Sequence, residues 1–184
     1  MESLKALLAP VFRGELLIGE PLARYTTYRI GGPADLLAVP STEEDVEAVL
    51  VKAKELGVPV TVIGSGSNLL VSDRGIRGVV VRLGRPLGRI RFDGDCVIAQ
   101  AGASLPRLAK MAADRGLAGV EWGGGVPGTV GGAVAMNAGA HGGETSRVLK
   151  RVELLDRSGR RLSLAPEEMG FAYRRCDRIR REGL

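Results

Sequence analysis

The chain has 184 residues, of which 45% are hydrophobic, 26% are charged and 4% are aromatic, and its formal net charge is +5. This composition is that of an ordinary globular protein and excludes a disordered or collagen-like chain. Two cysteines without a Cys-x-x-Cys spacing and a single histidine support neither a disulfide framework nor a metal site, so we expect no bound metal.

Hydropathy and charge limit the expected partners. No apolar run approaches the roughly 18 residues that a spanning helix needs, and the first residues lack the apolar core of a secretory signal. Part of the positive charge lies in arginines near the C-terminus, where no aromatic side chains are interleaved to stack on bases. We therefore expect a cytoplasmic protein that binds neither a membrane nor nucleic acid.

Strands and one helix are predicted in the first half of the chain. Ser41 and Glu44 have the spacing of a capping box, apolar residues then recur at helical spacing, and Gly57 supplies the end of this helix. Short apolar runs on either side predict buried strands. These strands cover residues 35–39, 58–63 and 78–83.

Two hairpins and a helix are predicted in the second half. Asp93-Gly94 is a favoured hairpin turn, and Asp156-Arg-Ser-Gly159 is a second turn between apolar runs. Ser104 is the expected cap of a helix that ends at Gly116. The hairpin strands are expected at residues 89–92 with 96–101, and at residues 151–155 with 161–164. The pattern predicts an α+β protein that divides near residue 84.

The first glycine-rich loop, Gly64-Ser-Gly-Ser-Asn68, follows a predicted strand. It lacks the Lys-Ser/Thr pair of a P-loop, and residues 69–73 are extended rather than the helix that a dinucleotide fingerprint requires. What remains is a loop of backbone N–H groups and two hydroxyls that suits a pyrophosphate. A simple tight turn is the alternative interpretation.

The second glycine-rich segment, residues 121–140, surrounds a Pro-Gly-Thr turn. Thr129 is the expected cap of a helix with little side-chain bulk in its first turn, and such a helix can place its backbone amides against a phosphate or a ring carbonyl. Close packing of helices is the alternative. Asn137 either bonds a ring or terminates the helix. The two glycine-rich segments together can hold two parts of a dinucleotide.

Tyr173 and Arg174 follow a short predicted helical turn at residues 166–171. An arginine beside a tyrosine can bind a carboxylate in a fork while the phenol bonds a neighbouring oxygen. Locally, the pair cannot be distinguished from surface residues of a basic tail. His141 lies next to Gly142 in a predicted loop, and we expect it to have no catalytic role.

Five segments occur in the same order as in the family of UDP-N-acetylenolpyruvoylglucosamine reductases, which belong to the vanillyl-alcohol-oxidase-like FAD-binding superfamily. These segments are residues 26–34, 62–71, 119–121, 125–140 and 171–174. The chain resembles this family from about residue 20 to residue 174. The resemblance implies an α+β fold of two FAD-binding subdomains, residues 1–83 and 84–184, which grip the flavin between them.

The resemblance also implies a function and its residues. Family members pass hydride from NADPH, through non-covalent FAD, to the enolpyruvyl group of a UDP-sugar, which gives the cell-wall precursor UDP-N-acetylmuramate. Tyr173 and Arg174 are the implied substrate-binding residues, with Arg174 catalytic because it stabilises the negative charge of a forming enolate. The implied FAD-binding residues are Gly64, Ser65, Gly66, Ser67, Asn68, Leu69, Gly125, Gly128, Thr129, Gly132, Ala133 and Asn137.

The sequence departs from the family pattern in two places. Cys176 stands where the family usually has a serine. The family's proton-donating serine and late glutamate lie in a C-terminal substrate domain expected beyond residue 184, so we assign no residue to these roles and expect little reductase activity from these residues alone. A non-catalytic FAD-binding fragment is the alternative. Another oxidase of the superfamily is disfavoured, because no histidine or cysteine lies in a motif for covalent flavin attachment.

Overall fold

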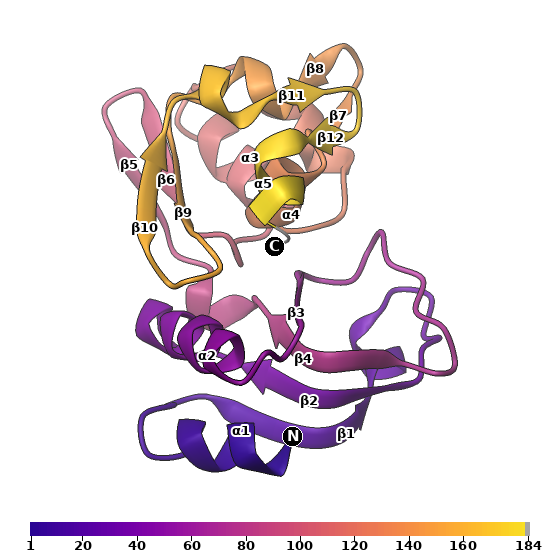
Figure 1. Ribbon diagram of the computed structural model, residues 1–184. Coiled ribbons are helices and arrows are strands. Elements are labelled where there is room, and N and C mark those ends of the chain that lie inside the picture. The colour runs from indigo at the N-terminus through magenta and orange to yellow at the C-terminus, as the bar shows by residue number, and fades with distance from the viewer. Residues whose placement is uncertain (183–184) are drawn as a thin grey trace.

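The structure is a computed structural model that describes residues 1–182, and it has two parts that lie one above the other in Figure 1. The part drawn in indigo to magenta contains a four-stranded sheet with two helices. The part drawn in pink to yellow contains three helices and four two-stranded ladders. This mixture confirms the expected α+β class. The division at residues 83 and 84 stays a prediction.

The four-stranded sheet has the order β1-β2-β4-β3. Strand β1 is antiparallel to β2, whereas β2 and β3 both run parallel to β4. The elements of this part are α1 (Glu2–Leu8), β1 (Glu15–Pro21), β2 (Pro33–Val39), α2 (Glu43–Glu55), β3 (Val60–Ile63) and β4 (Ile76–Arg82). The sequence predicted β2, α2, β3 and β4 but neither α1 nor β1. Its first glycine loop begins where β3 ends.

The N-terminal cap of helix α2 lies one residue later in the chain than the sequence predicted. The cap is Thr42 and Asp45 rather than Ser41 and Glu44: the amide of Asp45 donates to Thr42 Oγ1, and the amide of Thr42 donates to Asp45 Oδ2, both at 3.2 Å. Asp45 is only 1% exposed and also accepts the amides of Ser41 and Arg13. A buried carboxylate needs such donors, so the set of surrounding amides selects the cap.

The core beneath the sheet forms between α2, α1 and one face of β2 and β4. Leu36 and Val79 on the strands pack with Val49 of α2, and all three side chains are fully buried. The apolar residues at helical spacing in α2 therefore face the sheet, as the periodicity predicted. This packing holds β3 and β4 in place, and with them the loop that follows β3.

The other part contains most of the predicted elements in shorter form. Ser104 caps α3, since the Arg107 amide donates to Ser104 Oγ at 3.4 Å, and both predicted hairpins form. The elements are β5 (Ile90–Asp93), β6 (Cys96–Ala99), α3 (Leu105–Ala113), α4 (Val130–Ala135), β7 (Gly139–Ala140), β8 (Gly143–Glu144), β9 (Val152–Leu155), β10 (Arg161–Leu164), β11 (Phe171–Ala172), β12 (Arg175–Cys176) and α5 (Asp177–Glu182). Strands β7 and β8 were not predicted.

Side chains of the two parts meet at the start of α2. Glu43 accepts a 3.0 Å hydrogen bond from Gln100 Nε2 and a 2.8 Å hydrogen bond from Arg161 Nη1. These donors, Arg161 first, hold the pKa of the Glu43 carboxyl below its usual value. Across residues 1–182, no helix is long and apolar enough to cross a bilayer, and no group of three or more acidic, histidine or cysteine side chains could hold a metal ion.

Candidate functional site

The two glycine-rich loops contact each other directly. The hydroxyl of Ser67 donates a 2.9 Å hydrogen bond to the carbonyl oxygen of Pro127. Gly64 lies so close to Thr129 that a Cβ at Gly64 would collide with Thr129 Oγ1. The absence of a side chain at Gly64 thus lets the end of β3 approach the start of α4, which brings both predicted loops into one site.

Gly66 is required by packing within the protein. Its φ is +68°, and a Cβ there would overlap the carbonyl oxygen of Tyr25. In turn, the amide of Thr27 donates a 3.1 Å hydrogen bond to the Gly66 carbonyl. An L-amino acid at Gly66 would be strained and would push the neighbouring backbone away. The segment around Thr27 therefore packs against the first glycine-rich loop at Gly66 and holds it in place.

Other glycines of the site face open space. A Cβ at Gly125 would meet no atom within 4 Å, and one at Gly132 would meet only Thr129 Oγ1 at 3.4 Å. Both glycines are exposed. Gly128, between them, has a φ of +145°, which favours glycine. Bare backbone with room beside it is what a flat or anionic ligand needs to approach closely.

Backbone amides of the first loop are available to a ligand. Within residues 1–182, no backbone amide of residues 65–69 donates a hydrogen bond to another protein group. Residues 69–73 form no helix, which agrees with the absence of a dinucleotide fingerprint in the sequence. A run of backbone amides without acceptors in the protein can bind an anion such as a pyrophosphate.

The start of α4 presents fewer amides than the sequence predicted. Thr129 is the cap, as expected, and accepts the amide of Gly132 at 3.3 Å. The amides of Val130 and Gly131 donate to carbonyl oxygens of the neighbouring segment 101–103, each at 2.8 Å. Since these three donors are used within the protein, the expectation that they bind a phosphate is wrong. The exposed glycine surface, rather than the helix end, is the accessible feature here.

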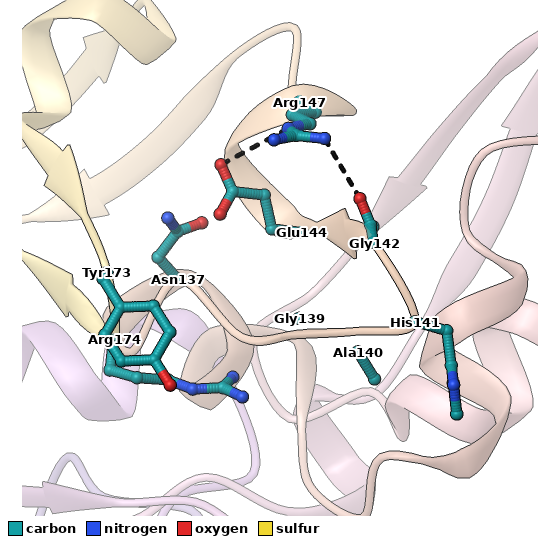
Figure 2. A pocket seen from close by; sticks show the side chains of 10 residues that line it. Asn137, Gly139, Ala140, His141, Gly142, Glu144, Arg147, Tyr173 and Arg174 are labelled. Atoms are coloured by element: carbon teal, nitrogen blue, oxygen red, sulfur yellow. Dashed lines mark hydrogen bonds and ion pairs between the residues drawn. The ribbon is translucent and has the colours of Figure 1, made fainter.

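A pocket of about 240 Å³ lies between the β7–β8 hairpin and the β11–β12 hairpin (Figure 2). It brings together residues from two separate stretches of the second half of the chain, within residues 137–147 and at residues 173–174. Its lining residues are Asn137, Gly139, Ala140, His141, Gly142, Gly143, Glu144, Arg147, Tyr173 and Arg174. The predicted substrate pair therefore lies in a pocket and does not belong to a featureless basic tail.

Tyr173 and Arg174 are the two turn residues of the β11–β12 hairpin, because Ala172 pairs with Arg175. Tyr173 is 85% exposed, and the Arg174 Cζ lies 5.4 Å from the centre of its ring. This distance allows a cation–π contact. Within the described chain, the Arg174 guanidinium forms no ion pair with a carboxylate. Its charge is available to an anionic ligand.

Backbone strain is concentrated at this pocket. Four non-glycine residues have a positive φ in the described structure, and three of them line the pocket. These three are Asn137 at +39°, His141 at +50° and Arg174 at +53°. Such conformations cost of order 1 kcal/mol or more in non-glycine residues and cluster at functional sites. The strain independently points to the pocket that contains the predicted pair.

Glu144 and Arg147 belong to the pocket wall, although the sequence analysis did not single them out. Arg147 Nε lies 3.6 Å from Glu144 Oε1, and Arg147 Nη1 donates to the Gly142 carbonyl at 3.0 Å (Figure 2). Glu144 Oε1 also accepts the Ser146 hydroxyl at 2.7 Å. The dipeptide His141-Gly142 is the sequence signal that could have located this part of the wall. Both residues have a positive φ, as the turn of a tight two-residue hairpin requires.

Asn137 lies beneath the pocket and is only 4% exposed. Its Nδ2 donates a 3.2 Å hydrogen bond to the Ala172 carbonyl, and its Oδ1 accepts the Ser146 amide at 3.0 Å. It also ends α4, as one of the two sequence interpretations proposed. Its contact with a cofactor ring stays a prediction.

Cys176 is buried beside Met169, and its Sγ donates to the Met169 carbonyl at 3.3 Å. A serine at this position would offer a hydroxyl donor to the same carbonyl. The departure at Cys176 therefore keeps a hydrogen bond of the same direction.

The sequence matches known proteins over most of its length. A family model described as FAD binding domain matches residues 34–165. The chain is 53% identical to the UDP-N-acetylenolpyruvoylglucosamine reductase of Rubrobacter xylanophilus and 47% identical to that of Bacillus subtilis. These matches cover 85% and 88% of this chain but 52% and 53% of the two relatives. The chain thus spans about half the length of the curated relatives it matches.

Solved structures share the fold. The crystal structure of UDP-N-acetylenolpyruvylglucosamine reductase from Thermus caldophilus matches with a TM-score of 0.73 and 38% identity, over 90% of this chain and 57% of that one. The 6-hydroxy-D-nicotine oxidase of Arthrobacter nicotinovorans matches with a TM-score of 0.66 at 22% identity, over 85% of this chain and 37% of the oxidase. The latter likeness concerns the fold alone. Together they confirm the expected FAD-binding fold of the vanillyl-alcohol-oxidase type.

Proposed function

We propose, on the premise that this chain belongs to the FAD-binding domain family, that it forms the FAD-binding part of a UDP-N-acetylenolpyruvoylglucosamine reductase. The proposed reaction uses NADPH as hydride donor and gives UDP-N-acetylmuramate, a peptidoglycan precursor made in the cytoplasm. The high identity to reductases from two organisms supports this choice over other flavoenzymes of the same fold.

The residues present fit FAD. The amides of residues 65–69 are suited to its pyrophosphate, and the bare backbone of Gly125 and Gly132 leaves room for a flat ring. When bound, the flavin supplies the hydride transfer. We propose as its binding residues the set Gly64, Ser65, Gly66, Ser67, Asn68, Leu69, Gly125, Gly128, Thr129, Gly132, Ala133 and Asn137.

Within this set, the residues have two different tasks. Gly64 and Gly66 allow the protein to bring its own segments together, since a side chain at either position would meet Thr129 or Tyr25. Gly125 leaves space that no protein atom fills, and a Cβ at Gly132 would meet only Thr129 Oγ1, at an ordinary contact distance of 3.4 Å. The first pair therefore shapes the site, and the second pair is proposed to contact the ligand.

Arg174 is proposed to bind the enolpyruvyl carboxylate of the substrate. Its guanidinium can donate two parallel hydrogen bonds to a carboxylate, and the positive charge would stabilise the negative charge that develops there as the double bond is reduced. The neighbouring Tyr173 hydroxyl can bond a further substrate oxygen. The observation that carries this proposal is the Arg174 guanidinium, which forms no ion pair within residues 1–182 and is held at the pocket by a strained turn.

The proposal is tested by separating FAD binding from turnover. Titration with FAD should show tight, acid-releasable binding in both the wild type and Arg174→Ala. In an NADPH-dependent assay of the full-length protein, which includes the C-terminal substrate domain that the resemblance implies, Arg174→Ala should lower kcat with UDP-N-acetylenolpyruvoylglucosamine by about 10²- to 10³-fold. A full-length protein that binds FAD but does not turn over the UDP-sugar would support the alternative, a non-catalytic FAD-binding module. A folded protein that ignores FAD would exclude both functions.

A further inference from the structure

We propose that Asn137 is a positioning residue that fixes the Arg174 turn against the opposite wall of the pocket. The proposal rests on the proposed function, because the residue that Asn137 positions is the one assigned to the substrate carboxylate. It goes beyond that function by explaining how an exposed two-residue turn can hold Arg174 in one place.

Asn137 joins the two walls of the pocket through its amide. The Nδ2 donates to the carbonyl of Ala172, the residue directly before Tyr173 and Arg174. The Oδ1 accepts the amide of Ser146, directly before Arg147 on the other wall. Figure 2 shows Asn137 between the Tyr173–Arg174 turn and Glu144. One side chain thus links both segments to the end of α4.

The chemistry of this link requires an asparagine amide. The side chain donates at one end and accepts at the other, and it is almost fully buried, so both bonds are shielded from water. An aspartate would keep the acceptor for Ser146 but lose the donor to Ala172. The backbone of Asn137 has a φ of +39°, which asparagine tolerates better than most residues do.

The hairpin that carries Arg174 needs such an anchor. Strands β11 and β12 pair through only two residues each, and a ladder of this size has little stability of its own. The base of the hairpin is held by burial, since Phe171 and Cys176 pack with Met169. The hydrogen bond to Ala172 acts at the other end, next to the turn. Without it, the strained turn of Arg174 would be free to relax.

Two substitutions at Asn137 and one matched control separate positioning from simple folding. Asn137→Gly removes both hydrogen bonds while keeping a residue suited to a positive φ, and Asn137→Asp removes only the donor. His141→Gly is the control: His141 also has a positive φ and lines the same pocket, but its side chain forms no hydrogen bond in the described structure. Relief of strain alone would therefore act alike in both glycine variants.

The first readout needs no ligand. Amide hydrogen exchange of residues 171–176 and 145–148 should speed up by roughly tenfold in Asn137→Gly, while His141→Gly leaves both segments unchanged. In Asn137→Asp the increase in exchange rate should be larger in residues 171–176 than in residues 145–148, because only the hydrogen bond to the Ala172 carbonyl is lost. Strand β4 should exchange as in the wild type. Unchanged exchange in residues 171–176, or a general increase that includes β4, would overturn the proposal.

The second readout is a double-mutant cycle with Arg174→Ala. In the full-length protein at saturating FAD, Asn137→Gly alone should lower kcat/KM for the UDP-sugar by roughly tenfold. In the Arg174→Ala background it should have no further effect, because the group that it positions is gone. Additive losses would show that Asn137 acts independently of Arg174 and would sink the idea. A full-length wild type, substrate domain included, without turnover would refute the proposed function, whereas the hydrogen-exchange result would still decide the role of Asn137.

Discussion

Ser67 donates its hydroxyl proton to the Pro127 carbonyl at 2.9 Å, and this bond joins two loops that are 60 positions apart in the sequence. Ser67→Ala should weaken FAD binding by about three- to tenfold, because one hydrogen bond contributes of order 1 kcal/mol and the loops would part more easily. Quenching of flavin fluorescence measures the affinity. The control is Ser163→Ala, an exposed serine on β10. Equal affinities for the two variants would contradict a role for the junction.

Glycines that face open space and glycines that pack against the protein should respond differently to an added methyl group. Gly125→Ala should leave the melting temperature nearly unchanged but lower FAD affinity at least tenfold, since its Cβ would enter space that no protein atom occupies. Gly66→Ala should lower both, because its Cβ would overlap the Tyr25 carbonyl at a positive φ. Thermal unfolding without FAD and a flavin titration separate the effects. A Gly125→Ala protein with normal affinity would remove Gly125 from the site.

Gly128→Val should damage FAD binding far more than His141→Ala. A branched side chain is incompatible with the φ of +145° at Gly128 and would crowd Ser67 Oγ, 3.3 Å from the Cβ position. His141 is exposed on a separate hairpin turn. Calorimetric titration with FAD should find no binding to the first variant and an affinity within about twofold for the second. Similar affinities would place the site elsewhere.

The turn between β9 and β10 should make stability depend on acid pH. The Ser158 hydroxyl, at 2.6 Å, and the amides of Ser158 and Arg160 lower the pKa of Asp156 from 3.8 to about 2. A carboxyl whose pKa is lower in the folded than in the unfolded state stabilises the fold at pH values above its unfolded-state pKa. This contribution is lost as the pH falls through the folded-state pKa. The wild type should therefore lose more stability than Asp156→Asn between about pH 4 and pH 2.

Urea unfolding at several pH values in this window measures the difference. Ser158→Ala provides an internal check, because it removes the largest influence on the Asp156 pKa and should move that pKa back toward its ordinary value. Parallel pH profiles for the wild type and Asp156→Asn would show that the carboxyl contributes nothing to folding in acid.

Local patterns in the sequence predict much of this fold. The periodicity after residue 42 identifies α2, and turn residues identify both longer hairpins. The cap of α2 is harder to predict from the sequence, because Ser41–Glu44 and Thr42–Asp45 have the same spacing. The choice depends partly on the Arg13 amide, 32 positions away, which bonds Asp45. A contact of that range leaves no local signature.

The site shows the same limit. Glycine-rich composition identifies the loops, whereas the Tyr173–Arg174 pair is singled out only by the resemblance to the reductase family. Nothing local distinguishes a glycine that admits a neighbouring segment, such as Gly64, from one that leaves space for a ligand, such as Gly125. Likewise, Glu144 lines the pocket from β8, a strand of two residues that is too short to give a periodic sequence pattern.

Under the proposed function, the left-handed turn at Arg174 sets stability and activity against each other. Glycine would adopt this conformation without penalty, so Arg174→Gly should relieve about 1 kcal/mol of strain. A laboratory evolution campaign that selected only for heat resistance would then favour the variant that lacks the guanidinium. Thermostable versions of this protein are best sought with Arg174 held constant, because the arginine persists there despite the conformational preference of its own backbone.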